Sequence, residues 1–143
     1  PKFWCPEMVN IADHNNTKVF RYADAILMMA ECYLELDDTD NAMRYLNMVK
    51  DRAQIARYET FKNYDHLHEE IERERARELF GEFQRKYDLV RWGSWYRQTF
   101  DYTDYKSLQD NILPCHEYYP IPDKEVTNSG NALDNDAYAE WGL

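Results

Sequence analysis

The fold is decided by residues 21–36, which read RYADAILMMAECYLEL. Twelve of the fifteen residues from Tyr22 to Leu36 are apolar, and the stretch contains neither glycine nor proline. Such a run predicts an α-helix over residues 21–36 that is buried on most of its faces. The run is too short to span a bilayer and carries three carboxylates.

These three acidic residues, Asp24, Glu31 and Glu35, are spaced seven and four residues apart, so they share one stripe of the helix. The simplest interpretation is that the stripe is the solvated edge. The alternative is that one of them, Glu31 above all, forms an inward ion pair with an arginine of a later helix. Cys32, in the same run, is expected to be a small buried hydrophobic side chain.

A second helix is predicted from about Asn41 to Ile55, after a turn at residues 37–40 in which Thr39 or Asp40 serves as the cap. Its apolar residues recur at intervals of three and four, which gives one packed face and an antiparallel helical hairpin. The hairpin fits the register of a tetratricopeptide repeat, roughly 34 residues long. In that register Ala30 and Ala42 lie at the close contact between the two helices.

Further helices are expected downstream. A charged segment begins near residues 63–65, and a narrow stripe follows at every fourth position: Leu67, Ile71, Arg75, Leu79 and Phe83. Because Arg75 stands where a hydrophobic residue is expected, some arginines of residues 72–78 are predicted to point inward. Gly81 interrupts the helix, and residues 87–92 are helical again, with Gly93 as the C-cap. Trp92 is predicted to share a buried face with Leu89, three residues away.

The chain changes character after Gly93. Eight of the 28 residues from Trp92 to Tyr119 are aromatic, and Pro114, Pro120 and Pro122 preclude a continuous helix. The sequence therefore predicts a single all-α domain over residues 1–143. It consists of a tetratricopeptide-like helical hairpin, further helices, and a long irregular aromatic- and proline-containing C-terminal region.

Charge and motifs exclude several classes of function. The chain carries 17 basic and 27 acidic residues, a net charge of −10, which argues against nucleic acid or an anionic membrane surface as a partner. His68-Glu69-Glu70-Ile71-Glu72 begins like a zinc-protease helix but lacks the second histidine. Residues 134–136 suggest a calcium loop but lack its glycine and distal glutamate. No catalytic residue, metal site or cofactor is expected, and none of the three cysteines lies in a CxxC motif, although Cys5 and Cys115 could pair.

One feature is suited to binding. Tyrosine and tryptophan rings stack on the C–H faces of sugars, and Asn or Asp side chains bond the hydroxyl groups. The loop region after Gly93 supplies this mixture, and the best candidates for ligand contacts are Trp95, Tyr96, Tyr102 and Tyr105. The alternative is that these rings only anchor a long loop on the helices.

Several motifs together resemble the SusD/RagB family of outer-membrane nutrient-binding lipoproteins. Residues 21–31 are similar to its RYADVLLMYAE helix, and the remaining motifs follow in the family's order at residues 45–53, 72–79, 87–93, 119–122 and 131–138. The departures are Phe83 near the family's glycine after Glu82, Tyr119 for a leucine, and Ala132 and Ala137 for a proline and a glycine.

The resemblance implies a surface lipoprotein of the Gram-negative outer membrane, built on tetratricopeptide-like helix pairs. Such proteins are not enzymes; they capture glycans, or in some cases peptides, for a TonB-dependent transporter of the SusC type. The resemblance also implies that this chain is the C-terminal portion of a protein several times longer. The lipid anchor, which would be its membrane contact, would then lie outside this chain, because no apolar signal precedes Cys5. Most ligand contacts of the family come from the absent part, so no binding residue carries over by motif.

A second interpretation is a free-standing tetratricopeptide-type adaptor that binds peptide in a helical groove. A single recognisable repeat is weak support for it, because a solenoid needs about three units to bury its faces.

Overall fold

The structure is a computed structural model that describes residues 8–10 and 19–142. Every regular element in these residues is helical, which confirms the all-α prediction. Packing divides the chain after Arg85 into two compact units, residues 1–85 and 86–143. The expectation of a single domain stays a prediction. None of the helices in the described part of the chain has the length and apolar character that a bilayer crossing requires.

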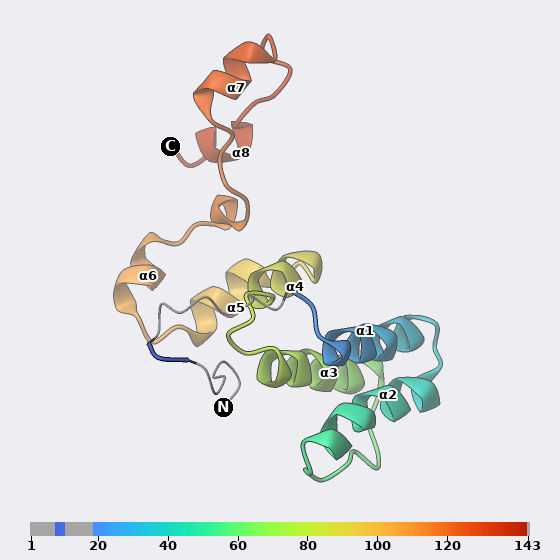
Figure 1. The fold of residues 1–143 in the computed structure, drawn as a ribbon. Helices are drawn as coiled ribbons and strands as arrows, with labels where there is room; N and C mark the ends of the chain where they lie inside the picture. Colours follow the sequence, from blue (N-terminus) through green and yellow to red (C-terminus); the bar gives the residue numbers. More distant parts are fainter. Residues whose placement is uncertain (1–7, 11–18, 143) are drawn as a thin grey trace. The chain divides into compact units, whose positions relative to one another are not determined.

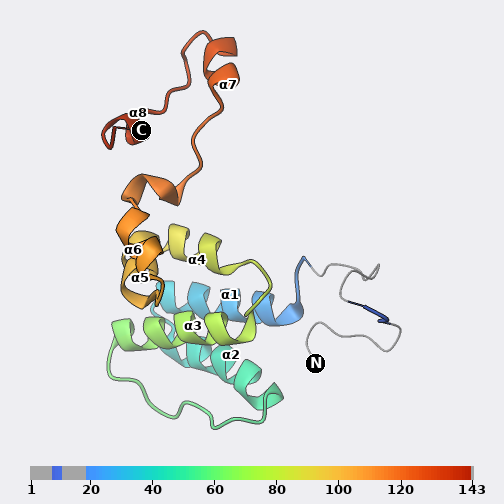
Figure 2. The same ribbon diagram turned by 90° about the vertical axis from the view of Figure 1, so that its left-hand side faces the viewer.

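The predicted hairpin is present in the first unit. Helix α1 (Tyr22–Glu35) and helix α2 (Thr39–Arg52) lie side by side in Figures 1 and 2, joined by a short turn. The cap of α2 is Asp38 rather than Thr39 or Asp40, because the Asp38 side chain accepts a 3.1 Å hydrogen bond from the backbone N–H of Asn41. The hydrogen bonds from Asn41 lower the pKa of the Asp38 carboxyl.

Helix α3 (Tyr64–Glu78) completes the core of this unit. Asn63 caps it by accepting a 3.0 Å hydrogen bond from the N–H of His66. Ala30 and Ala42 are fully buried, as the tetratricopeptide register predicts. The other buried residues of the core are Ile26, Leu27, Leu34, Leu46, Val49, Leu67 and Ile71.

A buried ion pair joins α1 to α3. Arg75 Nη2 lies 2.8 Å from Asp24 Oδ1, and the two residues are only 4% and 3% exposed. The prediction of an inward arginine is confirmed, and Asp24, one of the three carboxylates of the acidic stripe, is paired with it. The two helices are antiparallel, so the start of α1 meets the end of α3.

Polar contacts at both ends fix this antiparallel register. At the start of α1, the Arg21 guanidinium bonds Glu82 at 2.8 Å and the backbone oxygen of Glu78 at 2.7 Å. The hydrogen bond to Glu82 raises the pKa of Arg21. At the end of α1, the Tyr64 hydroxyl donates to the Glu35 carboxylate. The ends of the helices therefore cannot slide without breaking charged contacts.

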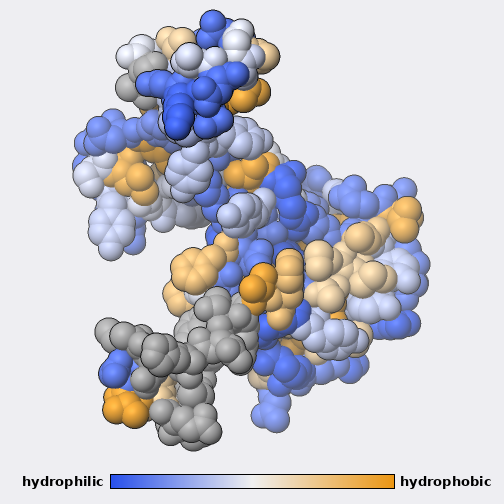
Figure 3. Space-filling model, turned by 45° about the horizontal axis from the view of Figure 1, so that its top comes forward, coloured by the Kyte–Doolittle hydropathy of each residue, from blue (hydrophilic) through white to orange (hydrophobic). Residues whose placement is uncertain are grey.

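The outward face of α1 is not covered by α2 or α3. Cys32 is exposed, which corrects the expectation of a buried thiol. Its neighbours on this face are apolar, and Figure 3 shows pale-orange atoms gathered in the region where Figure 1 draws α1. The prediction of a helix over the apolar run is confirmed. The expectation that this helix is buried on most of its faces is not, because only part of its circumference is buried. Cys115, in the second unit, is buried with a free thiol, and Cys5 lies outside the described residues.

The break between α3 and the next helix contains two left-handed residues. Gly81 has φ +76° and Phe83 has φ +63°, and Phe83 stands near the position where the resembling motif has glycine. A left-handed backbone is costly for a residue with a Cβ atom. Phe83 therefore adopts a backbone conformation that glycine would adopt at a lower energetic cost.

The second unit consists of short helices separated by irregular segments. Helix α4 (Arg85–Arg91), which begins at the division, precedes α5 (Trp95–Tyr102), α6 (Lys106–Asn111), the 3₁₀ helix η1 (Pro114–Glu117), α7 (Asp123–Asn128) and α8 (Asp136–Ala139). Residues 95–102, expected to be part of a loop, are thus helical. The reason is local, since neither glycine nor proline occurs between Gly93 and Pro114 to interrupt the backbone hydrogen bonds.

Candidate ligand-binding surface

The turn at Gly93 positions the aromatic residues of the second unit. Gly93 has φ +63°, its N–H donates to the Val90 oxygen, and the Ser94 N–H donates to the Leu89 oxygen, each at 2.9 Å. This pattern is a Schellman C-cap, so the predicted capping role of Gly93 is confirmed. The chain turns sharply here and starts α5 at Trp95.

Trp95 lies in a small core of the second unit. It is 9% exposed and buried with Leu89 and Ile112, and Trp92 packs against the same cluster, as the sequence predicts for Trp92. A tryptophan with so little exposed ring offers hardly any face to a sugar. A ligand contact by Trp95 stays a prediction, but its burial favours the anchoring alternative.

Tyr96 is half-buried against the same cluster. Its ring lies 5.9 Å from that of Phe100, with 32° between the planes. The Tyr96 ring therefore packs partly against Phe100 of the same helix. Its half-burial lies between that of a ring that anchors the segment and that of a ring free to contact a ligand.

Tyr102 and Tyr105 are different, because they are 82% and 75% exposed. They flank the turn between α5 and α6. The Gln109 side-chain amide donates to the backbone oxygens of Phe100 and Thr103, both at 3.2 Å, and so holds the turn from the side of α6. The two rings are thus presented to solvent from a turn whose backbone is fixed by hydrogen bonds.

The surroundings of these rings are polar and acidic. Asp101, near the end of α5, and Asp104, on the turn, are exposed, and Lys106 is paired with Asp110 at 2.6 Å. The segment from Gln98 to Leu143 carries 2 basic and 9 acidic residues. Such a surface suits a neutral hydroxylated ligand better than an anion.

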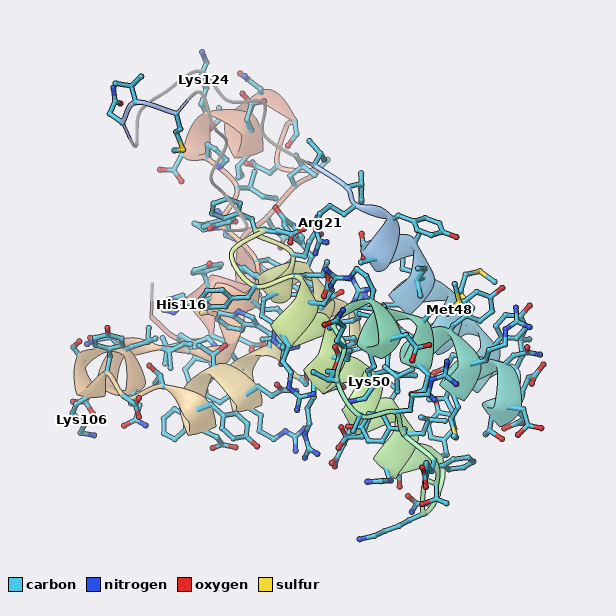
Figure 4. All side chains as sticks on the ribbon, turned by 60° about the horizontal axis from the view of Figure 1, so that its bottom comes forward. Arg21, Met48, Lys50, Lys106, His116 and Lys124 are labelled. Carbon is cyan, nitrogen blue, oxygen red and sulfur yellow. The ribbon has the colours of Figure 1, made fainter. Side chains whose placement is uncertain are left out.

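A second aromatic group surrounds Lys86. Its ammonium lies 4.3 Å from the ring centre of Tyr119, 5.3 Å from that of Trp95, and 3.5 Å from the backbone oxygen of His116, which Figure 4 labels. Tyr119 is nevertheless 84% exposed. Lys86 and Gln109 were not singled out from the sequence, because their partners are distant in the chain or belong to the backbone.

No group of three potential ligand side chains for a metal ion occurs within residues 8–10 and 19–142. The geometry offers exposed rings on a fixed turn, carboxylates and amides, which together can hold a sugar ring by stacking and hydrogen bonds.

The fold defines a class of protein. It is an all-α scaffold built on a helical hairpin and followed by an aromatic C-terminal unit. The chain belongs to the SusD family, whose pattern matches residues 8–138. It is similar to the SusD-like protein P25 of Formosa agariphila, with 38% identity over 144 residues that cover 95% of this chain and 27% of that protein.

A solved structure agrees. The crystal structure of a SusD superfamily protein from Bacteroides vulgatus superposes with a TM-score of 0.69 at 33% identity, over 78% of this chain and 25% of that chain. This chain therefore spans about a quarter of the length of these relatives.

Proposed function

We propose that this chain is the C-terminal portion of a surface lipoprotein of the outer membrane that binds glycans and delivers them to a SusC-like TonB-dependent transporter. Membership of the SusD family supports this general role. The role proposed is capture and transfer of a nutrient, without catalysis. The lipid anchor would be supplied by the part of the protein that lies outside these residues.

One observation supports a contribution of this chain to ligand binding: Tyr102 and Tyr105 are exposed on a turn that is held by hydrogen bonds. Loops and turns on a rigid helical scaffold are common places for binding residues. A tyrosine ring can stack on the apolar face of a pyranose while its hydroxyl bonds outward. We propose Tyr102 and Tyr105 as ligand contacts, and Tyr96 and Trp95 as residues that support the turn from beneath.

The test uses the full-length protein and a panel of neutral oligosaccharides, with affinity measured by calorimetry and stability by thermal unfolding. Replacing Tyr102 and Tyr105 by alanine should lower affinity about tenfold or more, with an unchanged melting temperature, because each ring contributes about 1 kcal/mol. Tyr87→Ala is the matched control, since Tyr87 is 71% exposed on another helix of the same unit. Trp95→Ala should lower stability instead.

Unchanged affinity after alanine replacement of Trp95, Tyr96, Tyr102 and Tyr105, with stability lost at Trp95 and Tyr96, would show that the region is only packing. Peptide binding without glycan binding would favour the tetratricopeptide-type adaptor. That alternative is supported by the α1–α2 hairpin but does not account for the family match over residues 8–138.

A further inference from the structure

Helix α5 ends without the kind of cap that closes α4. The last carbonyl oxygens of any α-helix lack partners within the helix. After α4, the left-handed Gly93 folds the backbone back and brings N–H donors to them. After α5, the C-cap residue is Thr103, whose backbone is extended with φ −86° and ψ 133°. An extended residue carries the chain away from the helix, so the end of α5 needs donors from elsewhere.

The Gln109 side chain supplies these donors from α6. Its amide nitrogen donates to the backbone oxygens of Phe100 and Thr103, both at 3.2 Å, although these residues lie nine and six positions away. A side-chain amide nitrogen carries two N–H groups, so it can serve both oxygens at once. Gln109 is half-buried, whereas Leu108 and Asp110 beside it are exposed. The Gln109 side chain therefore caps α5 from a neighbouring helix.

The turn that Gln109 caps carries the two exposed tyrosines. Tyr102 is the last residue of α5, and Tyr105 comes three residues later, directly before α6. Within the turn, the Tyr105 N–H donates to the Thr103 side-chain oxygen at 3.3 Å. The two rings are so exposed that they have little packing of their own to fix their directions. Their relative position therefore depends on the backbone of the turn, which Gln109 holds.

We infer that Gln109 is a positioning residue of the ligand site, which holds the Tyr102 and Tyr105 rings ready for one oligosaccharide chain without touching it. The inference rests on the proposed function of these two rings. Three residues span at most about 11 Å, so both rings can reach the same ligand molecule. Binding that must first order a loop and its side chains loses affinity to that ordering, and a turn ordered beforehand avoids the loss.

The test replaces Gln109 by methionine in the full-length protein, which keeps the side-chain length and removes both N–H groups. Calorimetry with the panel of neutral oligosaccharides should show an affinity about fivefold or more lower, through a less favourable binding entropy. The melting temperature should equal that of the control. Without ligand, the Tyr105 amide should exchange faster with deuterium, because the turn opens more often.

Two variants complete the design. Asn111→Leu is the matched control, because the Asn111 amide also donates to a backbone oxygen, at 2.7 Å, but to that of Ser107 in its own helix. Its affinity should be unchanged. Gln109→Lys is the rescue variant, because an ammonium also carries several N–H donors and a cation is favourable at a helix C-terminus. Its affinity should stay within about twofold of that of the unmodified protein.

The outcomes separate this inference from the proposed function. Unchanged affinity in Gln109→Met, with affinity lost in Tyr102→Ala and Tyr105→Ala, would overturn the inference and leave the proposed function in place. A loss of affinity equal to that of the control, or one that follows the melting temperature, would overturn it as well, because the role of Gln109 would then be structural. Unchanged affinity in both tyrosine variants would refute the proposed ligand contacts themselves, and the inference with them.

Discussion

The buried ion pair between Asp24 and Arg75 should be the most sensitive polar contact between α1 and α3. The 2.8 Å separation and the near-complete burial of both residues mean that the pair is little screened by solvent. Removing one partner of a buried pair costs about 3–5 kcal/mol. We expect Asp24→Asn, which keeps the shape and removes the charge, to lower the free energy of unfolding by about 3 kcal/mol.

Urea denaturation followed by far-ultraviolet circular dichroism measures this loss. The control is Arg57→Met, because Arg57 pairs with Asp51 at 2.5 Å but the two side chains are 65% and 41% exposed, so only a small loss is expected. Asp24→Leu combined with Arg75→Met should be less destabilised than the sum of the single changes, by about 2 kcal/mol. If Asp24→Asn cost no more than the control, or if the single changes were additive, the ion pair would not hold α1 on α3.

Three further predictions concern the first unit. Ala30→Phe should destabilise the hairpin by about 1–3 kcal/mol in the same assay, and a neutral result would refute the tetratricopeptide register. Phe83→Gly should raise stability by up to about 1 kcal/mol, since Phe83 has φ +63° and is 85% exposed; a loss would mean that its side chain makes a needed contact. The hydrogen bond to Glu35 raises the pKa of Tyr64 to about 12, above the ordinary value of 10. The contribution of this bond is therefore complete below pH 10 and lost as the pH rises towards 12, so the stability difference between the unmodified protein and Tyr64→Phe should shrink over that range; a constant difference would argue against the bond.

The helices up to Gly93 were predictable from the sequence because helix formation depends on local spacing. The apolar run of residues 21–36 gave α1 to within one residue at each end, and Gly93 gave the end of α4. Helix α5 was not predicted, because the many aromatic residues after Gly93 suggested a loop. No glycine or proline is present there to interrupt the backbone hydrogen bonds of a helix. Composition is a weaker guide than the presence or absence of helix breakers.

The candidate binding surface was predictable only as a region. The sequence placed Trp95, Tyr96, Tyr102 and Tyr105 in one group, because all four rings lie within eleven residues. The structure divides them by exposure, with Trp95 in a core and the last two in solvent. Trp95 is buried in a cluster with Leu89 and Ile112, which lie 6 and 17 residues away in the sequence.

The sequence by itself determined the helices up to Gly93 and the family that the chain resembles, because both depend on the order and spacing of residues along the chain. Tertiary structure alone decided which side of each helix is covered. Asp24 meets Arg75, 51 residues away in the chain, because antiparallel packing places the start of α1 beside the end of α3. Cys32 is exposed because α2 and α3 pack against the opposite side of α1. An apolar pattern in the sequence indicates that a helix face is suited to burial, but it does not indicate which element covers that face.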